Sequence, residues 1–333
     1  MNVDDTTQSL NKDVQKHIDR INELITNGDF QDSPDTLYEP IRYILNTGGK
    51  RLRPLLTLFG CYLFSGETEN ALMPGIGIEL FHNFTLIHDD IMDNAPLRRG
   101  QETVHRKWNQ NVAILSGDTI LFKAYHYLMQ VNEPLIKDVI MLFNECAIDV
   151  CEGQQFDMDF ENRERVSEEE YLKMIRLKTA AVLGFSLQLG ALIGGANVEN
   201  TEALKNFGIN IGLGFQLKDD LLDVFGDFGK FGKQVGGDII ANKKTYLLIK
   251  AMELANAEQN KKLQGWLHGD LSNEEKVKRV TQLYKELHIR QLTEQKISEF
   301  FEIALTYLNK IDCPEHRKEE LADFSSSLIE REN

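Results

Sequence analysis

The protein has 333 residues, of which 42% are hydrophobic and 27% are charged, a balance typical of a globular protein with a substantial core. Its formal net charge of −15 argues against a general nucleic-acid-binding protein, which would need a basic surface. The four cysteines show no CxxC spacing, so neither a structural zinc site nor a disulfide framework is expected. We find no bilayer-spanning apolar stretch and no secretory signal in the polar, acidic start of the chain, which predicts a cytoplasmic location.

The first candidate site is a glycine-rich basic turn at 48–54, with the sequence GGKRLRP. Glycine lets a backbone approach an anion closely, and the three cations beside it can pair with phosphate oxygens. Pro54 suits the first turn of a helix expected at 55–62, so the cations are predicted near a positive helix end. An ordinary solvated basic turn has the same composition, so the turn alone decides nothing.

A helix expected near 70–93 carries an acidic segment, HDDIMD, close to its end. Asp89 and Asp93 are four residues apart and share a helix face, whereas Asp90 lies about 100° around the helix from Asp89. Ionised carboxylates beside apolar residues lose hydration, and a divalent cation would offset their mutual repulsion. His88 is interpreted as a packing or supporting residue, because magnesium rarely takes imidazole ligands.

The segment LRRG at 97–100 follows at once and is expected to be a loop, because Pro96 and Gly100 flank its arginines. An arginine pair beside metal-binding carboxylates suits a metal-bridged phosphate.

No proline occurs between Pro134 and Pro314, and this gap permits long helices.

A helix is expected from Ser167, which is followed by an acidic first turn, to the stop signal Gly194–Gly195. It contains Lys178 and Thr179, which mean little by themselves. A helix near 201–226 then carries the second acidic segment, FQLKDDLLD, with Asp219 and Asp223 on one face. One DDxxD could equally be a solvated acidic turn. Two copies, each in an apolar helix, indicate metal sites.

Lys233 and Lys243 accompany a glycine-rich segment at 226–237, which is interpreted as a flexible loop. We find no convincing strand and no hairpin signal, so the prediction is one all-α domain over 1–333, with residues 1–35 as an N-terminal helical extension. Further helices are expected at 112–130, 136–160, 239–255, 274–287, 291–309 and 316–331.

Taken together, these segments resemble the trans-isoprenyl diphosphate synthases, also called polyprenyl synthetases, from about Gly48 to Lys244. The resemblance depends on five elements in fixed order: GGKRLRP at 48–54, HDDIMD at 88–93, LRRG at 97–100, KTA at 178–180 and FQLKDDLLD at 215–223. It implies a helical fold around a deep central cavity, Mg2+ as cofactor, usually three ions, and a homodimer. It also implies isopentenyl diphosphate and an allylic diphosphate as substrates.

The resemblance also implies roles for individual residues. Asp89 and Asp93 look like ligands to metals that bridge the allylic diphosphate, with Asp219 opposite, while Asp90 and Asp223 support them by hydrogen bonds or through water. The isopentenyl diphosphate site would comprise Gly49, Lys50, Arg53, His82 and Arg99. The allylic side would comprise Arg98, Lys178, Thr179, Gln216, Lys233 and Lys243.

The expected chemistry is ionisation, condensation and elimination. Cations stabilise the departing diphosphate, Thr179 and Gln216 oxygens temper the allylic carbocation, and the released diphosphate takes the proton. Closure of the 226–237 loop is a candidate for excluding water. Phe84, one turn and a half before Asp89, is expected to floor the cavity, with the small Thr85 and with Phe81 as a second limit. A C15–C20 product follows, with geranylgeranyl diphosphate favoured over farnesyl diphosphate.

Other protein classes share parts of this pattern. A terpene cyclase is expected to carry an NSE-type second motif and has no need of the turn at 48–54. A head-to-head squalene or phytoene synthase would show DxxxD motifs. A non-catalytic subunit of a prenyl synthase typically loses acidic residues that are intact here. A longer-chain polyprenyl diphosphate synthase and an unrelated cation-binding helical protein also remain as alternatives.

Overall fold

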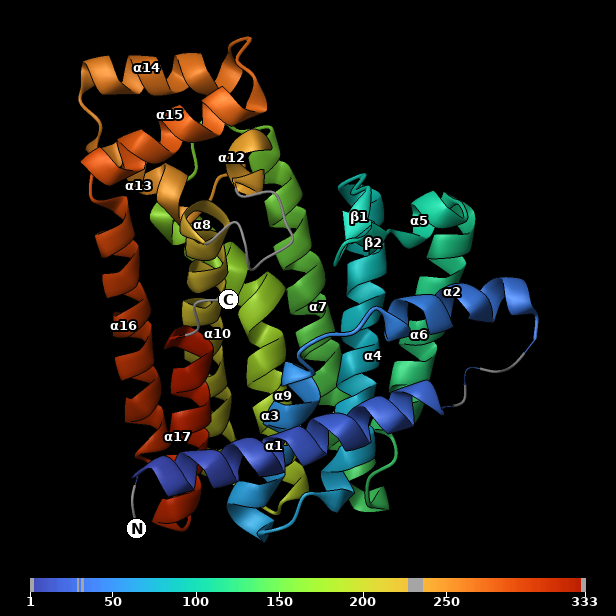
Figure 1. The fold of residues 1–333 in the computed structure, drawn as a ribbon. Coiled ribbons are helices and arrows are strands. Elements are labelled where there is room, and N and C mark those ends of the chain that lie inside the picture. Colours follow the sequence, from blue (N-terminus) through green and yellow to red (C-terminus); the bar gives the residue numbers. More distant parts are fainter. Residues whose placement is uncertain (1–2, 29, 31–32, 227–235, 331–333) are drawn as a thin grey trace. The chain divides into compact units, whose positions relative to one another are not determined.

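The computed structural model describes residues 3–28, 30, 33–226 and 236–330. Within these ranges the regular secondary structure is helical apart from one short hairpin (Figure 1), which confirms the all-α fold class. The longer helices are α1 (Val3–Thr26), α2 (Asp35–Asn46), α3 (Leu52–Ser65), α4 (Glu69–Met92), α6 (Gln110–Leu128), α7 (Ile136–Glu161), α8 (Glu168–Ile175), α9 (Ala181–Ile193), α10 (Val198–Phe225), α13 (Tyr246–Leu254), α14 (Ala257–His268), α15 (Asn273–Glu286), α16 (Ile289–Leu308) and α17 (Glu315–Glu330). Shorter ones are α5 (Val104–Lys107), η1 (Glu133–Leu135), η2 (Arg176–Ala180) and α12 (Gly237–Ile240).

Local sequence signals set several of these boundaries as expected. Ser167 caps α8: its hydroxyl accepts from the Glu170 amide, and the Glu170 side chain accepts from the Ser167 amide. α9 ends before Gly194, and Gly195 has a φ of +85°, which glycine adopts without strain. The helix expected over 239–255 is interrupted at 241–245 instead, and α14 was not predicted.

The chain divides into two compact units that interleave along the sequence. The first comprises Met1–Glu145, Val182–Lys205 and Leu308–Asp323, and the second comprises Cys146–Ala181, Asn206–Tyr307 and Phe324–Asn333. The organisation as a single domain stays a prediction.

In the first unit, α4 packs against both α3 and α6. Its core is made of aliphatic side chains such as Leu56, Ile76 and Ile120, each at most 1% exposed. α3 and α9 approach so closely that a Cβ at Gly190 would lie 2.1 Å from the Thr57 carbonyl oxygen. Glycine at this position therefore permits the contact that holds the two helices together.

In the second unit, a continuous apolar core joins α8, the second half of α10 and α13 to α16. η2 is a π-helical turn set between α8 and α9, a rare form that often occurs at functional sites. α7 lies directly against η2, because a Cβ at Gly153 would be 2.3 Å from the Lys178 amide nitrogen. The glycine thus makes room for the widened turn.

The loop expected at 97–100 is a two-stranded antiparallel hairpin, β1 (Leu97–Arg98) and β2 (Gln101–Glu102). Arg99 and Gly100 both have positive φ, 53° and 77°, as in the two-residue turns that match strand twist. The hairpin was missed because arginine rarely occupies such a position. It follows directly on the end of α4 (Figure 1).

One helical stretch, Glu168–Ile193, has by length and composition alone what a membrane span requires, a feature that the sequence analysis did not identify. The most apolar part of this stretch is 72% buried inside the protein. That burial is what the core helix of a globular fold requires.

Candidate active site

The carboxylates at the end of α4 have three different environments. Asp90 is buried, Asp89 is half-buried with 20% of its side chain exposed, and Asp93 is exposed. The helical geometry predicted for Asp89 and Asp93 is confirmed, since both lie within the last turn of α4 and its C-cap. Two carboxylates thus face solvent while the third points into the protein.

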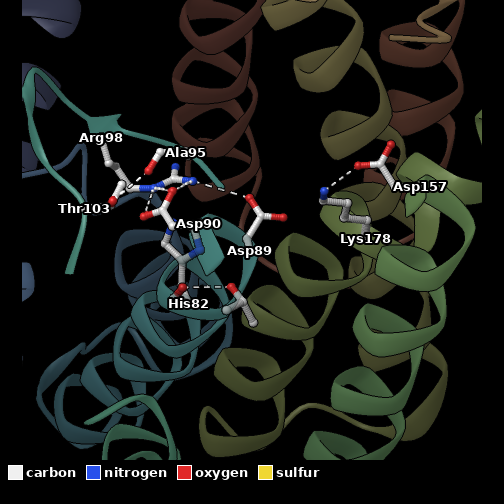
Figure 2. Close-up of polar contacts among 9 residues, drawn as sticks. His82, Asp89, Asp90, Ala95, Arg98, Thr103, Asp157 and Lys178 are labelled. Carbon is white, nitrogen blue, oxygen red and sulfur yellow. Dashed lines mark hydrogen bonds and ion pairs between the residues drawn. The ribbon is translucent and has the colours of Figure 1, made fainter. Parts of the chain in front are cut away.

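Arg98 neutralises the buried carboxylate and reaches the neighbouring one. Its Nε donates to both oxygens of Asp90, at 2.8 and 2.9 Å, and its Nη2 lies 2.7 Å from Asp90 Oδ1 and 3.3 Å from Asp89 Oδ2 (Figure 2). Burial raises the pKa of Asp90 above its usual value, and the Arg98 contacts only partly oppose that shift. Asp90 is therefore placed to orient Arg98, and the supporting role expected for it beside the metal stays a prediction.

Backbone contacts fix the hairpin on the end of α4. The Ala95 amide donates to the Asp90 carbonyl oxygen at 3.0 Å, and the Thr103 hydroxyl donates to the Ala95 carbonyl oxygen at 2.7 Å (Figure 2). Thr103 is 1% exposed. Sequence reasoning missed Thr103, because a lone threonine after a loop carries no signal of such a contact.

Arg99 joins the hairpin to the basic turn. Its Nη1 donates to the Gly48 carbonyl oxygen, and its guanidinium covers Gly49, where a Cβ would lie 3.0 Å from Nη1. Gly49 has a φ of +153°, which adds a second reason for glycine. Lys50 is exposed and Arg53 is half-buried beside them. The structure thus brings the residues predicted for the isopentenyl diphosphate site into one place.

His82 lies among these cations. Burial lowers the pKa of His82 well below its usual value, and Arg53, Arg99, Arg98 and Arg51 lower it further. The imidazole is therefore neutral near pH 7. It can exchange hydrogen bonds with an anion without adding a charge.

The residues predicted to limit product length lie one to two turns before Asp89 on α4. Phe81 is 1% exposed and packs edge-on against Phe143 with ring centroids 5.0 Å apart, so it belongs to the core. Phe84 is only half-buried. The centroid of its ring lies 5.9 Å from that of Phe81 and 4.6 Å from that of His88. Thr85 donates its hydroxyl to the His82 carbonyl oxygen at 2.8 Å.

In the second unit, a chain of hydrogen bonds runs through the second acidic segment. Asp220 is buried and accepts from the Tyr171 hydroxyl and, at 3.0 Å, from Gln216 Nε2. Gln216 Oε1 in turn accepts from the Thr179 hydroxyl at 3.1 Å. Burial, then the nearby Asp238, raise the pKa of Asp220 well above its usual value. The chain holds the Thr179 and Gln216 oxygens in fixed positions.

These groups surround a cavity of about 110 Å³ within the second unit. Four residues predicted for the allylic side share its wall, although they come from three separate segments of the sequence: Lys178 and Thr179, Gln216, and Lys243. Lys178 pairs with Asp157 at 2.6 Å, a contact drawn in Figure 2. The cavity wall therefore combines lysine cations and the Thr179 hydroxyl with the carboxylates of Asp157, Asp220 and Asp238.

Asp219 and Asp223 share a face of α10, as predicted, and both are half-buried. Asp223 Oδ2 accepts from the Asp238 amide at 3.0 Å, at the start of α12. The supporting role expected for Asp223 beside the metal stays a prediction. Lys233 and most of the 226–237 loop lie outside the described residues.

Known proteins match this chain over most of its length. Residues 34–287 match the polyprenyl synthetase family. The chain belongs to this family. A geranylgeranyl pyrophosphate synthase of Geoglobus acetivorans is 38% identical over 320 residues, which cover 95% of this chain and 96% of the relative. A geranylfarnesyl diphosphate synthase of Natronomonas pharaonis is 38% identical over 252 residues, 70% of this chain and 74% of the relative. A crystal structure of a geranylgeranyl pyrophosphate synthase superposes with a TM-score of 0.88 and 40% identity over all of both chains.

As a polyprenyl synthetase, the chain is a trans-prenyltransferase of the short-chain kind, and the terpene cyclase and head-to-head alternatives fall away. The family is generally metal-dependent. No group of three His, Cys, Asp or Glu side chains is preassembled as a metal cage among the residues that the structure describes. Pairs of carboxylates such as Asp89 and Asp93 nevertheless fit magnesium, which commonly takes one or two carboxylates and completes its shell with water and substrate phosphate.

The polyprenyl synthetase also holds site residues that its sequence did not single out. Asp157 and Tyr171 belong to none of the sequence motifs described above. Asp157 contacts the predicted site residue Lys178, and Tyr171 contacts Asp220, which in turn contacts the predicted residue Gln216. Only their neighbours in space identify them.

Proposed function

We propose that this polyprenyl synthetase joins isopentenyl diphosphate head-to-tail to an allylic diphosphate and makes geranylgeranyl diphosphate as its main product. The supporting observation is that Arg98 and Arg99, adjacent in one hairpin, link two kinds of site. Arg98 contacts the carboxylates of α4, and Arg99 contacts the basic turn at Gly48. A metal-bridged diphosphate and a second diphosphate can thus bind side by side.

Asp89, Asp93 and Asp219 would hold magnesium, and we propose three ions. Bound magnesium would neutralise the negative charge that develops on the leaving diphosphate. Arg98, Lys178, Lys233 and Lys243 are the residues that we propose to bind allylic diphosphate oxygens. Gly49, Lys50, Arg53, His82 and Arg99 hold the isopentenyl diphosphate. Asp90 and Asp223 orient the groups beside them.

The C–O bond of the allylic diphosphate breaks first. Thr179 and Gln216, held by the chain from Tyr171 and Asp220, place oxygens where they temper the allylic carbocation. The isopentenyl double bond then attacks the allylic carbocation, which forms the new C–C bond and leaves the positive charge on the tertiary carbon of the isopentenyl unit. The CH2 carbon next to that tertiary carbon loses a proton to the released diphosphate. The new double bond removes the positive charge from the carbon chain. Water must stay out, or the cation becomes an alcohol.

The direct test is incubation of the purified protein with isopentenyl diphosphate, magnesium and each allylic primer in turn, followed by sizing of the products. We expect one main C20 product. A C15 or C25 main product would correct the length but keep the activity. Cyclic hydrocarbons, or no consumption of isopentenyl diphosphate with any primer, would contradict the proposed condensation.

Phe84 is proposed as the floor of the hydrophobic channel, supported by its partial exposure on α4 between the core residue Phe81 and Asp89. Replacing it with alanine removes a large aromatic side chain, so Phe84→Ala should shift the main product by at least one isoprene unit, to C25 or longer. Product sizing by chromatography checks this. Phe84→Tyr keeps the ring and should retain the parental length.

The same measurement on Phe81→Leu separates the two candidate limits. Phe81 packs in the core, so its variant should lose stability and keep its product length. An unchanged product from Phe84→Ala together with a longer one from Phe81→Leu would assign the limit to Phe81. The small side chain of Thr85, whose hydroxyl donates to the His82 carbonyl oxygen of the same helix, is proposed to leave space in the channel next to Phe84.

A homodimer and a cytoplasmic location also stay proposals. The support for a dimer is an apolar stripe on α6, where Leu115 is 60% and Phe122 is 71% exposed, one heptad apart on one face. Light scattering on the purified protein should give about twice the chain mass. Phe122→Glu should shift that mass toward the monomer, and a monomeric parent protein would refute the dimer.

A further inference from the structure

Arg51 stands in the middle of the basic turn, yet its side chain is buried. It is 4% exposed and has a φ of +48°, an uncommon backbone conformation for a residue with a side chain. Its Nη1 pairs with Glu79 Oε1 of α4 at 2.8 Å, and Glu79 is 2% exposed. Its Nη2 donates to the Leu45 carbonyl oxygen of α2 at 3.0 Å. These contacts attach the turn at 48–54 to α2 and α4 through the Arg51 guanidinium.

The third guanidinium nitrogen reaches the N-terminal helix. Arg51 Nε donates to Asn22 Oδ1 of α1 at 2.8 Å. Ile21 and Ile25 beside Asn22 are 0% and 2% exposed, so this part of α1 is packed firmly in the first unit. α1 lies outside residues 34–287, which match the family. The turn is therefore fixed from α1, α2 and α4 at once.

Arg51 lies between the two cations proposed to hold isopentenyl diphosphate, Lys50 and Arg53. The backbone around it takes positive φ at Gly48, Gly49 and Arg51, so the turn is not held by regular helical geometry. Loss of the Asn22 acceptor would leave the Arg51 Nε–H buried without that partner. Arg51 would then shift to find another, and its neighbours would move with it.

We propose that Asn22 is a positioning residue for isopentenyl diphosphate, acting through Arg51 on Lys50 and Arg53. α1 is then part of the substrate site and more than an extension of the fold. The inference rests on the proposed function, because it assigns the turn to isopentenyl diphosphate. It predicts a defect confined to one of the two substrates, which a general loss of packing would not produce.

The test uses the full-length protein with Asn22→Leu, which keeps the size of the side chain and removes the acceptor, and Asn22→Asp, which keeps the acceptor. Steady-state kinetics with each substrate varied in turn give both KM values and kcat, and calorimetric titration gives the Kd of isopentenyl diphosphate alone. For Asn22→Leu we expect KM and Kd for isopentenyl diphosphate to rise about tenfold, the size expected for one lost hydrogen bond to a charged group. The allylic KM and kcat should stay within about twofold.

Asn22→Asp should behave like the parent protein. Glu23→Leu should do so too, because Glu23, the next residue of α1, is exposed and pairs with Arg20 at the surface. An unchanged isopentenyl diphosphate Kd in Asn22→Leu, or an equal rise in both KM values, would overturn the inference. If Asn22→Leu does not fold, Asn22→Ser, too short to reach Arg51, is measured with the same expected result. An unmodified protein that binds no isopentenyl diphosphate would refute the proposed function itself.

Discussion

Asp89→Ala should lower turnover by roughly a thousandfold while the protein stays folded, and Asp219→Ala should do the same. Each substitution removes a carboxylate proposed to hold magnesium on the leaving diphosphate, where loss of several kcal/mol of transition-state stabilisation is expected. Neither side chain is needed to fill the core, because both are only half-buried. Single-turnover rates in saturating magnesium, with far-ultraviolet circular dichroism as the folding check, measure both effects.

Asp118 supplies the matched control for this comparison. It is a half-exposed carboxylate on α6, 3.7 Å from His88, and it has no part in the proposed site. Asp118→Ala should retain turnover within about twofold, as surface substitutions usually do. Near-parental turnover in Asp89→Ala would refute the metal assignment at α4.

Arg98→Met should weaken both folding and catalysis. It leaves the Asp90 carboxylate, which is 2% exposed, without the cation that contacts both of its oxygens. Breaking a buried ion pair from one side typically costs about 3 kcal/mol of the free energy of unfolding. Turnover should also fall, by about a hundredfold, because Arg98 is proposed to pair with the allylic diphosphate.

The two effects of Arg98 can be separated by a second substitution. In Arg98→Met with Asp90→Leu, the buried charge is gone, so most of the lost stability should return. Turnover should stay low, because the phosphate-binding cation is still absent. Urea unfolding and single-turnover rates of the parent, single and double variants test both statements. Full recovery of turnover in the double variant would show that Arg98 acts only on the fold.

Local sequence signals were enough to predict much of the fold. The cap at Ser167, the stop at Gly195 and the spacing of Asp89 and Asp93 each depend on residues within one or two helical turns. The helix break at 241–245 and the π-helical turn around Lys178 were not foreseeable in this way. Both depend on how the chain packs against distant segments, as the contact of Gly153 with η2 shows.

In the candidate site, too, some residues could be predicted from local sequence and others could not. Residues that carry the family motifs, such as Arg98 and Gln216, could be named from the sequence. Their partners could not, because Asp157, Tyr171 and Asn22 meet Lys178, Asp220 and Arg51 only in space, 21, 49 and 29 positions away. A motif predicts which side chains meet the substrate, whereas the residues that contact those side chains follow from tertiary contacts alone.

Calorimetric titration with a non-ionisable allylic thiodiphosphate tests most directly whether the aspartates hold the metal on the diphosphate. The parent protein should bind this analogue at least tenfold more tightly in magnesium than in EDTA, and Asp89→Ala and Asp219→Ala should each lose that difference. Equal binding with and without magnesium, or a full magnesium effect in both variants, would contradict the account.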